Sequence, residues 1–72
     1  MKANETPRYR IQWQSETIGV SDTADKAIRC MREVMGYELL VNGFKHINEF
    51  TVFDSKTECV LARSKDYDPL PV

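Results

Sequence analysis

The stretch TADKAIRCMREVM, residues 23–35, decides the fold, because it carries a sustained helical pattern. Its apolar side chains recur every three or four residues and are Ala24, Ala27, Ile28, Met31, Val34 and Met35. Thr23, or Ser21 before it, can cap the first turn, where Asp25 meets the positive end of the helix dipole. Gly36 stands where a C-terminal cap is expected. The pattern therefore predicts one amphipathic helix over about residues 23–35.

Before the helix, polar and apolar residues alternate from residue 8 to residue 14, which is typical of a half-buried strand. The apolar set is Tyr9, Ile11 and Trp13, and the polar set is Arg8, Arg10, Gln12 and Gln14. Ile18 and Val20 resume the alternation on even positions, so the register must shift near residues 15–17. One bulged strand and a short hairpin both satisfy this pattern.

The segment after the helix admits two interpretations. Residues 38–41 can form a strand, with Asn42 and Gly43 as a turn into residues 44–47, or residues 37–49 can form a long ordered loop. Further on, residues 50–53 and 58–63 are rich in aromatic and β-branched residues and are separated by the polar run DSKT. These two segments predict a closing hairpin.

The order of strand, helix and strands predicts an α+β fold. We expect a single sheet of three to five mainly antiparallel strands with the helix packed on one face. Seventy-two residues leave no room for a second core, so residues 8–64 form one domain. Residues 1–7 are polar and end in a proline, which predicts a disordered arm, and two prolines among the last four residues predict a flexible tail over residues 65–72.

Composition excludes several classes of protein. Ten basic residues against eleven acidic ones give a net charge of -1, which argues against binding driven by bulk attraction to DNA. The chain lacks the ~18 consecutive apolar residues of a membrane-spanning helix. Its start, MKANETPRYR, lacks the apolar run of a signal peptide. We therefore expect a soluble cytoplasmic protein.

Groups suited to catalysis or metal binding are few. Cys30 and Cys59 have only His46 as a basic partner, and free cysteines in a helix or strand usually serve as small apolar residues. His46 and Glu49 do not make a recognised metal-ligand spacing, and the three glycines are isolated, so there is no phosphate-binding loop. We predict no catalytic residue, no metal site and no cofactor, and hence a protein that is not an enzyme.

Three segments carry a resemblance: YRIQW at residues 9–13, VSDTADKAIRCM at residues 20–31 and FTVFD at residues 50–54. Together they resemble a group of short uncharacterised prokaryotic and phage reading frames of β-α-β-β order. The architecture is also similar to that of small phage-encoded inhibitors of bacterial defence, of the anti-CRISPR type. The resemblance implies the fold, and in a phage or mobile element it implies an inhibitor or adaptor.

The uncovered face of the sheet carries the functional hypothesis. If the helix covers the Trp13 side of the first strand, the other side presents Arg8, Arg10, Gln12 and Phe53. A small core makes a rigid active site hard to build, so we predict a non-enzymatic protein–protein interaction module whose open face binds a partner protein or a second copy. The alternative is a small domain that binds single-stranded nucleic acid on the same face. A secondary candidate surface comprises Lys26, Arg29, Arg32, Tyr67 and Leu70.

Overall fold

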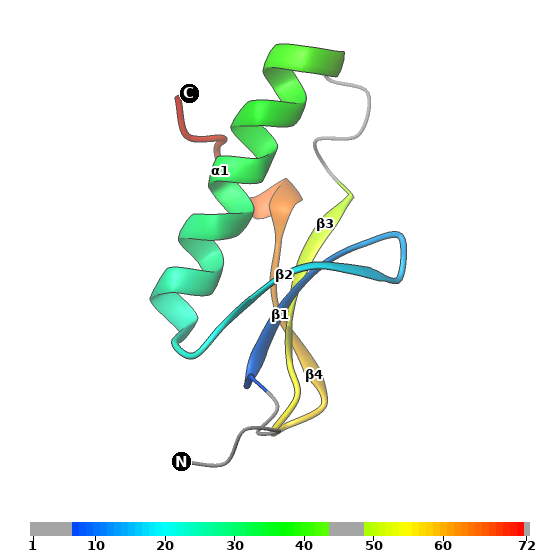
Figure 1. The fold of residues 1–72 in the computed structure, drawn as a ribbon, viewed down its shortest axis with the longest axis vertical. Coiled ribbons are helices and arrows are strands. Elements are labelled where there is room, and N and C mark those ends of the chain that lie inside the picture. The colour runs from blue at the N-terminus through cyan, green and yellow to red at the C-terminus, as the bar shows by residue number, and fades with distance from the viewer. Residues whose placement is uncertain (1–6, 44–48, 72) are drawn as a thin grey trace.

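The computed structural model describes residues 7–43 and 49–71, and within them the predicted α+β class is confirmed (Figure 1). The elements are β1 (Tyr9–Trp13), β2 (Glu16–Ser21), α1 (Ala24–Asn42), β3 (Phe50–Asp54), β4 (Cys59–Arg63) and a short 3-10 turn, η1 (Ser64–Asp66). The strands form one sheet of order β2-β1-β3-β4 with every neighbouring pair antiparallel. β2 and β3 flank β1, and α1 connects them along one side of the sheet.

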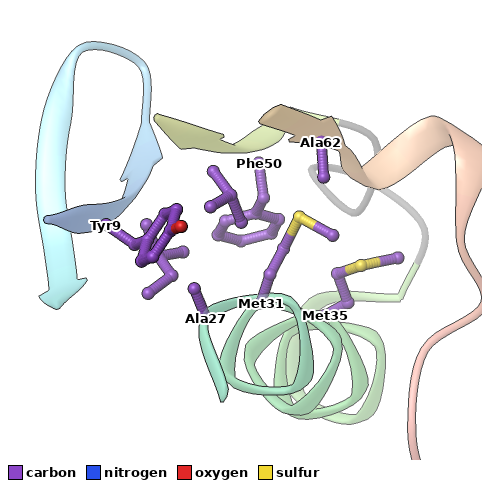
Figure 2. Packing of buried hydrophobic residues seen from close by; sticks show 8 residues of the cluster. Tyr9, Ala27, Met31, Met35, Phe50 and Ala62 are labelled. Carbon is purple, nitrogen blue, oxygen red and sulfur yellow. The ribbon is translucent and has the colours of Figure 1, made fainter. Parts of the chain in front are cut away.

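The core lies between α1 and the sheet, as Figure 2 shows. Its buried apolar residues are Tyr9, Ile11, Ala27, Met31, Met35, Phe50, Val52 and Ala62. In β1 and β3 alternate residues are buried, as the period of a strand requires. Met31 extends from the centre of α1 toward the sheet and has no exposed surface. Trp13 packs at the edge of this cluster, with its ring centroid 6.3 Å from that of Phe50.

The helix starts where the sequence predicts and ends later. The Thr23 hydroxyl accepts a hydrogen bond from the Lys26 N–H, which confirms Thr23 as the N-cap. The predicted end at Gly36 was wrong, because α1 continues to Asn42 and is capped by Gly43 at a φ of 67°. The strand proposed for residues 38–41 was therefore wrong as well. Residues 44–48, the rest of that ambiguous segment, lie outside the described residues.

Tertiary packing explains the extra turns of α1. Leu39 follows Met35 by four residues and packs against the core, so the apolar stripe continues past the glycine. Gly36 is itself buried. The cost of a glycine inside a helix, about 1 kcal/mol, is therefore offset by burial of the stripe on both sides of it.

The hairpin interpretation of the first segment is confirmed and the single bulged strand is wrong, because β1 and β2 are separate antiparallel strands; their pairing also contains a register shift. Gln14 and Ser15 make the two-residue turn, with φ values of 51° and 71°. Two positive φ values are the requirement of the type I′ turn that suits the twist of a hairpin. The register shifts between Ile11 and Gln12, where Ile18 is the extra residue of β2.

We expect the Ser15→Gly variant to be more stable than the natural chain by up to about 1 kcal/mol, because glycine relieves the strain of a positive φ. Urea unfolding followed by circular dichroism measures the difference. Thr17→Gly, placed inside β2, is the control and should lower stability, since glycine weakens a strand. A loss of stability in Ser15→Gly equal to that of the control would contradict the turn assignment.

The C-terminal segment, expected to be a flexible tail, instead lies against α1. The Leu70 N–H donates to the Arg32 carbonyl at 3.0 Å, and the Arg32 Nε donates to the Asp68 carbonyl at 2.8 Å. Ser64, which is fully buried, accepts a hydrogen bond from the Phe50 N–H. These contacts hold the chain against the rest of the domain as far as Leu70, whereas residues 1–6 of the predicted arm lie outside the described residues.

Candidate interaction face

The face of the sheet opposite α1 is organised in two rows that cross all four strands. In the first row, Arg10 pairs with Val20 of β2 and with Phe53 of β3, and Phe53 pairs with Val60 of β4. In the second row, Gln12 pairs with Thr17 and Thr51, and Thr51 pairs with Arg63. Paired residues of neighbouring strands project to the same side. These eight residues are called the open face below.

The first row is apolar at three of its four positions. Val20 is 53% exposed and Val60 is 40% exposed, while Phe53 is half-buried between its neighbours. Ile18 and Leu61, the extra residues at the register shifts of the outer strands, are also exposed. Exposed apolar residues gathered on one surface are typical of a site of association.

The charged groups of the open face are both positive. Arg10 and Arg63 lie on it, and none of its eight residues is acidic. Within residues 7–43 and 49–71, the ion pairs are Arg8 with Asp54 and Lys26 with Asp22, so both open-face guanidinium groups are available to a ligand.

Arg8 does not join the open face, although it was predicted to. Its Nε and Nη2 donate to the two carboxylate oxygens of Asp54, each at 3.0 Å, and its guanidinium lies 5.1 Å from the centroid of the Tyr9 ring. Asp54 is buried and pairs with Tyr9, so it belongs to the side that α1 covers. A buried carboxylate requires a cation, and Arg8 precedes β1, so strand alternation does not dictate where its side chain points.

Further hydrogen bonds tie this ion pair to the backbone. The Lys56 N–H donates to Asp54, and the N–H and hydroxyl of Ser55 both donate to the Arg8 carbonyl. The hydrogen bond from Arg8 is the main reason why the pKa of Asp54 falls from 3.8 to about 2. The Arg8–Asp54 pair and these hydrogen bonds join the start of β1 to the turn between β3 and β4, so the pair has a structural role.

The structure brings together four of the five residues of the secondary surface. Arg29, Arg32, Tyr67 and Leu70 line a shallow groove of about 520 Å³, together with Asp25 and Ile28. Lys26 lies outside this groove, and its Nζ is 3.8 Å from Oδ1 of Asp22. The guanidinium of Arg32 is already bound to the C-terminal segment, which reduces its value for an external partner.

Sequence reasoning missed three important residues of the open face: Val20, Val60 and Arg63. Their place depends on the two register shifts, and a shift by one residue moves a side chain to the other face. The only local signal was the β-branched character of the two valines.

The cysteines differ in environment. Burial raises the pKa of the half-buried Cys30 thiol, which disfavours the reactive thiolate. Cys59 is exposed, and its thiol donates to the Thr57 carbonyl. The pairs of either cysteine with His46 cannot be placed, because His46 lies outside the described residues. In the part of the chain that the structure describes, histidine, cysteine and acidic side chains form no group of three suited to a metal ion.

No helix among the described residues has the length and apolar character needed to cross a membrane. Comparison of the chain with protein-family models, with curated proteins and with solved structures gave no match.

Proposed function

We propose that this protein is a non-enzymatic protein-interaction module and that the open face is its interface. The observation that carries the proposal is the first row, in which Val20, Phe53 and Val60 surround Arg10 on a sheet face that no described element covers. A role in the cytoplasm as an inhibitor or adaptor of a host protein is the form of this function that the resemblance favours.

The residues of the open face have complementary roles in such an interface. Phe53 and the two valines supply apolar area, which drives association when it is removed from water. Arg10 and Arg63 supply guanidinium groups, which fix the orientation of a bound protein through directional hydrogen bonds and cation–π contacts. Gln12 and the threonines beside it provide hydrogen-bonding groups at the rim.

Single-stranded nucleic acid is the second candidate ligand, because Phe53 lies beside Arg10 and a base can stack on its ring. Such sites usually present several aromatic rings. In the described strands, Tyr9, Phe50 and Trp13 pack on the side of α1, which leaves Phe53 as the aromatic residue of the open face. Together with the net charge of -1, this arrangement favours a protein ligand.

The experiment compares capture of binding partners by two double variants with the same change in charge. Arg10→Glu with Arg63→Glu reverses both charges of the open face, whereas Lys26→Glu with Arg29→Glu does so on exposed positions of α1. Arg8 is avoided, because its substitution would unpair the buried Asp54. We expect the natural chain and the α1 variant to retain a host protein from a lysate treated with nuclease, and the open-face variant to lose it.

Circular dichroism of both variants should match that of the natural chain. Equal capture by all three proteins would place the interface elsewhere. Capture that disappears after nuclease treatment would favour the nucleic-acid alternative, which a steep loss of binding between ~50 and ~200 mM salt would support.

A further inference from the structure

We propose that the open face also binds a second copy of this chain, related by a twofold axis that runs parallel to the strands between β1 and β3. The inference rests on the proposed function, because it uses the same face and adds a second copy of the chain as a ligand of that face.

A twofold axis in this orientation reverses the order of the strands. β2 of one copy then lies over β4 of the second copy, and β1 lies over β3. The rotation keeps each residue at the same position along the strand direction. Each row therefore faces the same row of the second copy, with the order of its residues reversed. Val20 faces Val60 of the second copy, and Arg10 faces Phe53 of the second copy.

The first row is complementary to its own reverse. Read from β2 to β4 it is valine, arginine, phenylalanine and valine, so reversal places valine on valine and arginine on phenylalanine. A guanidinium over an aromatic ring is a favourable cation–π contact, and the symmetry makes it twice. In the second row Arg63 faces Thr17 of the second copy, so the arginines do not oppose one another.

The other in-plane twofold axis, perpendicular to the strands, gives a poor match. It keeps each strand over itself and places the first row on the second, so that Phe53 meets Thr51 and Val60 meets Arg63. Apolar residues would then be buried against polar and charged ones. The sequence of the rows therefore selects the axis parallel to the strands.

Sheet twist and area set the expected strength of the dimer. When two sheets pack face to face, their strands cross at about 30°, so facing residues are displaced from one another. This displacement is smallest at the two central strands, which carry Arg10 and Phe53. With strands ~4.8 Å apart and residues ~3.3 Å apart, the face covers roughly 300 Å² in projection. This is below the ~800 Å² per partner of a standard interface, so we expect a weak dimer that forms at micromolar to millimolar concentrations.

The first measurement is the mass in solution by light scattering between ~10 µM and ~1 mM, the range that this small area implies. The mass should rise with concentration from 8.3 kDa toward twice that value. Arg10→Glu and Phe53→Ala should each weaken the association about tenfold or more, because each removes both cation–π contacts. Arg29→Glu, the same charge change on α1, should leave it unchanged.

The second measurement tests the axis by chemical cross-linking. In a background of Cys30→Ala and Cys59→Ser, a chain with Val20→Cys is mixed with an affinity-tagged chain with Val60→Cys and treated with a short bis-maleimide. We expect the mixed dimer to form, and Val20→Cys alone or Val60→Cys alone to cross-link poorly, because the axis holds identical valines at opposite edges of the sandwich.

The outcomes separate this inference from the proposed function. A chain that stays monomeric at all concentrations rules out the second copy, as does efficient cross-linking of Val20→Cys to itself. If the monomer still captures a host protein through Arg10 and Arg63, the proposed function stands without the dimer. If that capture is also insensitive to the open-face variant, both proposals fail.

Discussion

Replacing Met31 by alanine is expected to leave a large fraction of the chain unfolded at room temperature. Met31 has no exposed surface and lies between α1 and the sheet, where Figure 2 shows it beside Phe50 and Ala62. Truncation of a buried methionine to alanine costs about 2–5 kcal/mol, since apolar burial is lost and a cavity remains. A core of this size supplies only ~3–5 kcal/mol in total, so a single truncation removes most of it.

Far-UV circular dichroism with urea titration measures this effect. Leu40→Ala is the matched control, because Leu40 belongs to the same helix but is 70% exposed. The control should remain folded, with a midpoint close to that of the natural chain. Equal losses in the two variants would mean that Met31 does not hold the helix on the sheet.

The Asp54→Asn variant is expected to be markedly less stable than the natural chain at neutral pH, because it leaves Arg8 without its bidentate partner. The carboxyl has a pKa of about 2 in the folded protein, below the ordinary 3.8. A folded pKa that is lowered contributes stability in full above the unfolded value, and the contribution disappears as the pH falls through the folded value. The stability gap between the two proteins should therefore be constant above about pH 4 and narrow between pH 4 and about 2.

Thermal unfolding at a series of pH values tests this expectation. Asp22→Asn is the control, since Asp22 is 3.8 Å from Lys26 and both side chains are largely exposed. Exposed pairs contribute little, so this variant should show a gap several times smaller at every pH. A gap between Asp54→Asn and the natural chain that persists unchanged down to pH 2 would argue that the charge of Asp54 is not what stabilises the pair.

Of the predicted open-face residues, the structure brings Arg10, Gln12 and Phe53 together and separates Arg8. Alternation alone placed Arg10 and Gln12 on one side of β1, because a strand has a period of two. Alternation could not place Arg8, since its position is decided by Asp54, which is 46 residues away in the chain. The same limit applies to Val20, Val60 and Arg63, whose row depends on pairing between strands.

Local pattern determined the α+β class, Thr23 as the N-cap of α1, the alternation of β1 and the closing hairpin. Each of these follows from propensity, capping or periodicity within a few residues. Only the tertiary structure decided that α1 passes through Gly36, that the C-terminal segment docks at Arg32, where the two register shifts lie and that Arg8 turns to Asp54. These features depend on burial and on partners distant in the chain, because a helix continues while its apolar stripe is covered and a buried carboxylate takes a cation wherever the fold supplies one.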